Sequence, residues 1–368
     1  MPAEHWLRQP DAVAAFTPSE GFCCTAFRVR LPEPGGATPA DAAALADGTT
    51  GMSTGFLSVL AEAPSWAALT ARPSFFGNPL LFPFAYGVAG GTFEYRDQRY
   101  TLRPTRWGRV AHGLVRDHSW TVDGTWSDAD GDHIRASITT AGDAGMLAEF
   151  PFPFRLTATY TLSGASLTLV AAATNLGSGP MPFGFGVHPY LPIPFAPDGE
   201  LTDDVVRADP DQLDAGGAPS AGGSIALAPA AAPFDLRAGR TVAALLEAQG
   251  ALRGAGGGLY VTYAKRAEKA DKADKDEGIA GIRWSLVNRR RGVTVEIETG
   301  EDCRAMVLFA PREPTTVISP VIGTCLPGFL DDAARGRDLG RLELAPGETW
   351  STRVVVRVRL DPPINTPS

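Results

Sequence analysis

The chain has 368 residues, of which 44% are hydrophobic, and its formal net charge at pH 7 is −8. This length and composition are sufficient for one large β domain or two ordinary domains with a sizeable core. The negative charge disfavours nucleic acid and anionic membranes as main partners, because both are bound by basic surfaces.

The cysteines and the N-terminal stretch indicate the compartment. The four cysteines form no CxxC pair and have no zinc-ligand spacing, so we expect no metal site and buried free thiols in a reducing environment. The first residues, MPAEHWLRQP, contain no basic start followed by an apolar run, and no stretch is long and apolar enough to span a membrane. These features predict a cytoplasmic protein. The cysteines are Cys23, Cys24, Cys303 and Cys325.

The first part of the chain predicts short strands separated by loops. VAAF (13–16) and FCCTAFRVRL (22–31) are expected to be strands. The stretch 32–50 is rich in Pro, Gly and Ala and is predicted to be a loop or insertion, with a weak helical signal at 40–45. NPLLFPFAYG (78–87) is apolar, but its two prolines argue against a central strand, so we expect a buried, irregular crossing.

The middle of the chain carries the clearest pattern. TFEY and RYTL (92–95 and 99–102) predict a hairpin, and WTVDGTWSD (120–128) contains an Asp-Gly turn signal. In FRLTATYTLSGASLTLVAAATN (154–175), apolar and polar residues alternate on both sides of Ser-Gly. This pattern predicts an amphipathic antiparallel hairpin with one face on the core.

The remainder predicts further strands and two irregular stretches. Residues 195–236 are predicted to be loop-like, 240–252 a short helix ended by Gly250, and 265–278 a solvated, lysine-containing insertion. Strands follow to the end. No composition break or repeat divides the chain, so we predict one domain over 1–368, with insertions at 32–50 and 265–278. The predicted fold class is an all-β, large antiparallel β-sandwich.

Two histidines are the candidates for proton transfer, because the unperturbed pKa of histidine lies near 6.5. His112 and His188 are each followed by a residue that constrains the backbone, Gly113 and Pro189, at junctions of loop and strand. A lone histidine is more often structural than catalytic. Tyr190 follows in FGFGVHPYL and offers a sugar ring an apolar face with a polar tip. The other histidines are expected in the tail or at the surface: His5, His118 and His133.

Four segments, in order, resemble the aldose 1-epimerase (galactose mutarotase) family. They are NPLLFPF, HGLVRDHSW, the hairpin that leads through NLGSGPMPFGFGVHPYL, and the closing LGRLELAPGETWSTRVVV. The histidine-proline-tyrosine segment with its hairpin is the most specific. The resemblance implies a galactose mutarotase-like supersandwich, no cofactor, a small-molecule sugar as partner, and a monomer or homodimer.

The resemblance also implies a reaction, the interconversion of α and β anomers of an aldose by acid–base ring opening. His188 matches the family's acid and His112 its second histidine. Arg116 matches the arginine of the family's HGF-x-R segment. We assign substrate contacts to four residues: Arg116, Tyr190, Phe82 and Ser319.

The sequence departs from the family pattern in two places. The family's base is a glutamate before proline on a late strand, where this chain has Ser319–Pro320. A serine hydroxyl is too weak a base to replace a carboxylate. Ala85–Tyr86–Gly87 stands where the family has Asn–Arg. A carboxylate from a nearby loop would have to supply the base instead, and the candidates are Glu313, Asp331 and Asp332.

Several functions therefore stay open. The first is an epimerase with a displaced base, or with His112 as the base; a hexose-6-phosphate 1-epimerase is a lesser variant. The second is a carbohydrate-binding protein without catalysis. In a third interpretation, both histidines have only a structural role in the core. A glycosidase built on Glu296 and Glu298 fits poorly, since both side chains are expected on one solvated strand face. A carboxylate beside His188 would favour the enzyme, and a serine-lined or apolar wall would favour binding.

Overall fold

The computed structural model describes residues 3–31, 55–71, 75–104, 108, 110–215, 226–253, 258–266, 281–311, 315–330 and 342–360. Strands are the predominant regular structure of these residues, and every pair of named strands is antiparallel, as the alternating sequence predicts. The predicted insertion at 32–50, most of the one at 265–278, and the weak helix at 40–45 lie outside the described residues.

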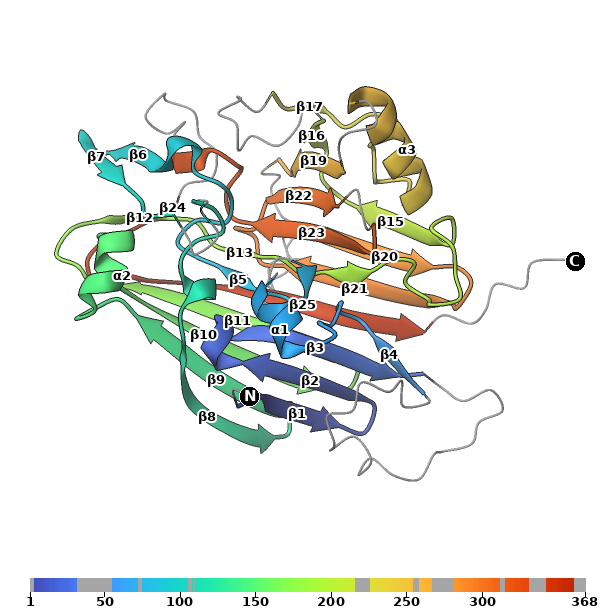
Figure 1. Ribbon diagram of the computed structural model, residues 1–368, viewed down its shortest axis with the longest axis horizontal. Helices are drawn as coiled ribbons and strands as arrows, with labels where there is room; N and C mark the ends of the chain where they lie inside the picture. The colour runs from blue at the N-terminus through green and yellow to red at the C-terminus, as the bar shows by residue number, and fades with distance from the viewer. Residues whose placement is uncertain are drawn as a thin grey trace, which may run out of the picture.

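A nine-stranded sheet forms one layer of the sandwich (Figure 1). Its central hairpin is the predicted one, and Ser163–Gly164–Ala165–Ser166 forms the turn. In sheet order, the strands are β18 (Arg240–Thr241), β15 (Asp204–Ala208), β20 (Arg283–Asn288), β21 (Val293–Thr299), β25 (Thr349–Leu360), β11 (Ser166–Asn175), β10 (Phe154–Ser163), β9 (Gly131–Thr139) and β8 (Thr121–Asp128).

Two further sheets cover this layer. The N-terminal sheet, blue in Figure 1, packs through β1 and β2 against β9 and β10. It consists of β1 (His5–Gln9), β2 (Ala12–Thr17), β3 (Cys23–Arg30) and β4 (Phe56–Ser58). The eight-stranded sheet consists of β17 (Ala228–Pro229), β16 (Gln212–Asp214), β19 (Leu259–Ala264), β22 (Ala305–Ala310), β23 (Val317–Gly323), β13 (Gly186–Val187) and β5 (Leu80–Leu81), with β14 (Leu191–Pro192) also paired to β23.

Short elements complete the described fold. The predicted hairpin pairs β6 (Thr92–Tyr95) with β7 (Gln98–Thr101), and β12 (Met181–Phe183) pairs with β24 (Leu342–Leu344). The helices are α1 (Trp66–Ala71), α2 (Ala144–Glu149) and α3 (Val242–Arg253). Among the described residues, no helix has the length and apolar character needed to cross a membrane.

One large apolar cluster fills the space between the layers. The alternating residues of β10 point into it: Phe154, Leu156 and Ala158 are fully buried, while Arg155 between them is exposed. The crossing at 78–87 is buried and contains only the two-residue strand β5, which agrees with the prediction from its prolines.

The structure corrects several local predictions. The predicted tail contains β1, so His5 lies in a strand. The stretch predicted to be loop-like contains β15, whose buried residues pair with β20. The Asp-Gly pair does not form a turn, because β8 runs through it and absorbs Asp123 as a bulge against β9. The helix α3 continues past Gly250. His133 is 7% exposed and bonded to Asp128 and Thr161, so it is not a surface residue.

Candidate functional site

The two candidate histidines lie together although 76 positions separate their numbers in the chain (188 − 112). Their ring centroids are 5.3 Å apart, with the rings edge to face. His188 follows β13, which is held between β5 and β23. The neighbouring strands therefore hold β13 on both sides, directly before His188.

A tight turn positions His112. His112 and Gly113 both have left-handed backbone conformations, with φ of 66° and 71°. A Cβ atom on residue 113 would lie 2.0 Å from the carbonyl oxygen of Phe82, so only glycine fits at this contact. The Nδ1 atom of His112 lies 2.9 Å from the Ala85 carbonyl oxygen. The irregular crossing thus supports both the backbone and the ring of His112.

The hydrogen bond to Ala85 defines the proton positions of His112. A carbonyl oxygen only accepts hydrogen bonds, so Nδ1 of His112 carries the hydrogen. In the neutral ring the lone pair is then on Nε2. His112 is half-buried, and this nitrogen is the one that can accept a proton.

His188 has a different environment, because hydroxyl groups occupy both of its ring nitrogens. Its Nδ1 atom lies 2.7 Å from Oγ of Ser319, and its Nε2 atom lies 2.9 Å from the hydroxyl of Tyr190. The ring is 4% exposed, Ser319 0% and Tyr190 1%. A neutral imidazole has one donor and one acceptor, and each hydroxyl can complement either. The hydrogen-bonding capacity of His188 is therefore used within the protein.

Burial also sets the charge of this cluster. The pKa of His188 lies well below its usual value, first because burial penalises the charged ring, and then because positive charge on His112 or Arg116 would repel it. Burial raises the pKa of the Tyr190 hydroxyl far above its usual value. His188 and Tyr190 are therefore both neutral at physiological pH.

Arg116 is the buried cation of the site. It lies in a short 3₁₀ turn, Val115–Asp117, directly after the His112 turn, and is 8% exposed. Its Nε atom lies 3.4 Å from Oδ1 of Asp117. Its positive charge acts to lower the pKa of both His188 and Tyr190, so Arg116 belongs to the same cluster.

The other residues that were predicted to contact a substrate are packed inside the protein. Phe82 is fully buried, with its ring 4.8 Å from that of Phe154, a place for core packing and not for contact with a substrate. Tyr190 is buried as well and stacks on His188 at 4.3 Å. Tyr86, in the segment that stands where the family has Asn–Arg, donates a hydrogen bond to the Val321 carbonyl oxygen. The loop carboxylates Glu313, Asp331 and Asp332 lie outside the described residues.

Two aromatic residues of the site were missed in the sequence. Phe309 of β22 lies opposite Ser319 of β23 in the strand register, and its ring is 6.3 Å from His188. Phe75 lies 6.2 Å from Tyr190. Both are partly exposed. The pairing of β22 with β23 would have identified Phe309, but sequence alone does not give that register. Within the described part of the chain, no group of three or more His, Cys, Asp or Glu side chains is arranged to hold a metal ion.

The architecture is that of a galactose mutarotase-like β-sandwich. The family model of aldose 1-epimerase matches residues 50–357, so the chain belongs to the aldose 1-epimerase family. No curated protein matches the sequence.

Solved structures share the whole fold at low identity. A galactose mutarotase-like protein from Clostridium acetobutylicum is 17% identical with a TM-score of 0.71, and the match covers 97% of this chain and 98% of that one. An aldose epimerase homologue from C. elegans is 12% identical with a TM-score of 0.67, covering 98% and 100%. Galactose 1-epimerase from Lactobacillus acidophilus is 15% identical with a TM-score of 0.66, covering 97% and 94%.

Proposed function

We propose that this protein binds an aldose beside His112 and has lost the acid–base interconversion of anomers. One observation carries the proposal: both ring nitrogens of His188 are hydrogen-bonded to uncharged hydroxyls, of Ser319 and Tyr190. A group that donates a proton to a sugar must be protonated and within reach of the sugar. His188 is neutral, buried and bonded elsewhere.

The position of the family's base supports the same conclusion. The Ser319 side chain at that position is fully buried and holds His188. Its hydroxyl cannot remove a proton from an anomeric hydroxyl, because a neutral hydroxyl that gains a proton becomes a strongly acidic oxonium ion and is therefore a far weaker base than a carboxylate. The wall of the site is thus serine-lined and aromatic, which is the arrangement that favours binding.

The accessible side of the cluster has the chemistry that a sugar needs. The rings of Phe309 and Phe75 are partly exposed and offer apolar faces for the C–H groups of a pyranose. Nε2 of His112 accepts a hydrogen bond from a sugar hydroxyl when the ring is neutral. The substrate class is therefore a neutral or phosphorylated aldose, of which the ring is the part recognised here.

Calorimetric titration tests the binding. D-glucose, D-galactose and their 6-phosphates are titrated into the wild type, Phe309→Ala and Phe56→Ala. Phe56 is a matched control, because it is a half-buried phenylalanine on β4, remote from the histidines. We expect Phe309→Ala to weaken binding of one or more of these sugars about 3- to 10-fold. Equal weakening in both variants, or no binding of any aldose, would refute the proposal.

One observation favours a second candidate, a 1-epimerase that uses His112 as the base. The tautomer set by Ala85 leaves the lone pair of His112 on Nε2, where it can accept a proton. The rate of mutarotation separates the two functions, because a binding protein leaves that rate unchanged.

A further inference from the structure

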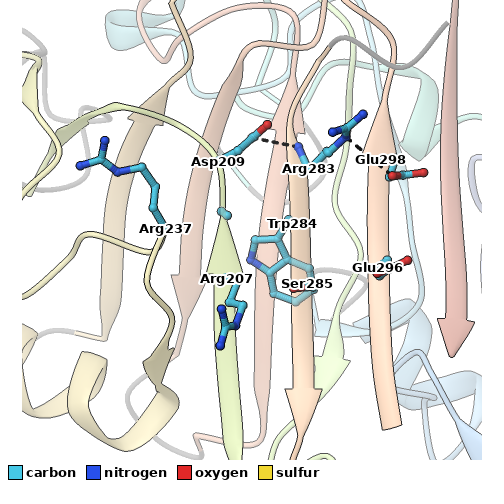
Figure 2. Close-up of a pocket in the computed structure, with 9 residues that line it drawn as sticks. Arg207, Asp209, Arg237, Arg283, Trp284, Ser285, Glu296 and Glu298 are labelled. Carbon is cyan, nitrogen blue, oxygen red and sulfur yellow. Dashed lines mark hydrogen bonds and ion pairs between the residues drawn. The ribbon is translucent and has the colours of Figure 1, made fainter. Parts of the chain in front are cut away.

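A pocket lies in the nine-stranded sheet, away from the histidine cluster beside the eight-stranded sheet. Its volume is about 320 Å³, which suits a small metabolite. Figure 2 shows most of its side chains on the adjacent strands β15, β20 and β21, while Asp209 follows β15 and Arg237 comes from the segment before β18. The lining residues that matter here are Arg207, Arg237, Arg283, Ser285, Glu296 and Glu298.

The strand register explains the hollow. Arg207 pairs with Ser285, and Ser285 pairs with Glu296, so the three lie in one row across the sheet. Side chains in such a row are about 5 Å from their neighbours. The side chain of Ser285 is small, so it leaves a gap in the row that the longer side chains of Arg207 and Glu296 border.

The ion pairs around the pocket leave an excess of positive charge in it. Cations outside the lining pair with its carboxylates: Glu296 with Arg359 at 2.8 Å, and Glu298 with Arg357 at 3.5 Å. Within the lining, Arg283 also pairs with Glu298, at 3.8 Å. Asp209 pairs with Lys265 at 2.7 Å. The acidic side chains are therefore compensated without any help from Arg207.

Arg207 itself is uncompensated. It is exposed, and no hydrogen bond or ion pair is recorded for it within the described ranges. Arg237 is held by both carboxylate oxygens of Asp235. A guanidinium offers a planar fork of donors that matches a carboxylate or a phosphate group.

We propose that this pocket binds a small hydroxylated anion. The carboxylate or phosphate of the ligand pairs with Arg207, and its hydroxyls bond to Ser285 and to Glu296. The positive excess is notable in a chain of net charge −8, because the whole molecule otherwise repels anions. The proposal does not depend on aldose binding at His112.

Calorimetric titration at low salt tests this site, with inorganic phosphate and D-glucuronate as probes and D-glucose as the neutral reference. Arg207→Gln should weaken the binding of an anion about 10-fold or more, the loss typical of a charge-assisted hydrogen bond. Arg353→Gln removes the same charge from another exposed arginine, on β25, and should change little. Ser285→Val fills the gap without a change of charge and should also weaken binding.

The outcomes are distinct. Binding of glucuronate alone identifies a carboxylate ligand, and binding of phosphate as well extends the class to phosphates. Both results support the proposal if Arg207→Gln binds the anion more weakly than the wild type does. No binding of either anion overturns it. Equal binding in the wild type and Arg207→Gln also overturns it and places the anion elsewhere, including at the His112 site.

Discussion

His188 is held as a neutral, buried ring between two hydroxyls. A buried imidazole without partners would leave two polar atoms unsatisfied, at a cost of about 1–3 kcal/mol each. Ser319 and Tyr190 remove this cost. The same bonds that stabilise the ring also occupy both of its nitrogens, so under the proposed function the stability of the ring and the loss of catalysis have one cause.

The lowered pKa of His188 predicts how stability depends on pH. An unfolded histidine has a pKa near 6.5, whereas the folded ring has a pKa well below it. Above pH 6.5 both states are neutral. As the pH falls below 6.5, only the unfolded state gains a proton, and the free energy of unfolding falls by up to about 1.4 kcal/mol per pH unit.

Urea denaturation at pH 7.5 and pH 5.5 measures this dependence. His188→Gln should be less stable than the wild type at pH 7.5, but the difference should shrink at pH 5.5, because the variant has no ring to protonate. An undiminished difference at pH 5.5 would show that the ring is already protonated in the folded state.

The sequence predicted which residues meet at this site better than it predicted what they do there. The motif around His188 and the turn at His112–Gly113 brought the two histidines together, as the resemblance implies. Tyr190 was expected to face a sugar, but it turns inward onto His188. The direction of a side chain after Pro189 depends on β23 and Ser319, which are distant in the sequence and paired only in the fold.

At the scale of elements, the His112 turn is a rigid support. Leu114 donates a backbone hydrogen bond to Phe82 at 2.9 Å, and Gly113 lies against the same residue. The left-handed pair His112–Gly113 is thus held to the irregular crossing and sets the distance between the two imidazoles.

Gly113→Ala should disrupt this support. The added Cβ would overlap the Phe82 carbonyl oxygen, so we expect a loss of about 3 kcal/mol or more in the free energy of unfolding. Gly90→Ala is the control, since Gly90 has a similar φ of 65° and no atom lies within 4 Å of its Cβ position. It should cost only the strain of the left-handed conformation, about 1–2 kcal/mol. Equal losses in chemical denaturation would contradict the close contact.

The β10–β11 hairpin is the element that the sequence predicts best, since a period of two over both strands allows only one face to be buried. The short strands β13, β14 and β5 were not predictable, because two residues carry no period. Strand β15 was missed because Ala, Pro and Gly around it resemble a loop.

The hairpin allows a direct test of this alternation. Leu156→Ala removes a fully buried side chain and should lower the free energy of unfolding by about 2–5 kcal/mol. Thr157→Ala, on the opposite face, should cost less than about 1 kcal/mol. Thermal denaturation of both variants compares the two losses of stability. Similar losses would mean that both faces of the hairpin are packed.

At the scale of the whole molecule, the sandwich encloses its chemically reactive groups. All four cysteines are free and buried. Burial raises the pKa of the thiols of Cys23, Cys303 and Cys325 to about 12, and that of Cys24 well above its usual value. Thiol reactivity requires the thiolate form and access to solvent. Burial in the sandwich disfavours the thiolate and excludes solvent, so we expect these thiols to be unreactive.

Titration with a thiol reagent at pH 8 measures this protection. We expect almost no reaction in the native protein and reaction of four thiols per chain after unfolding in urea. Rapid reaction of one or more thiols in the native state would show that the sandwich opens locally to solvent.

Under the proposed function, the protein keeps the sandwich of its family and a pair of adjacent histidines but not the proton transfer. Polarimetry of freshly dissolved α-D-glucose and α-D-galactose, with the purified wild type and with His188→Gln and His112→Gln, tests this claim most directly. We expect all three proteins to leave mutarotation at its spontaneous rate. Acceleration by the wild type that disappears in either histidine variant would contradict the account and establish an epimerase.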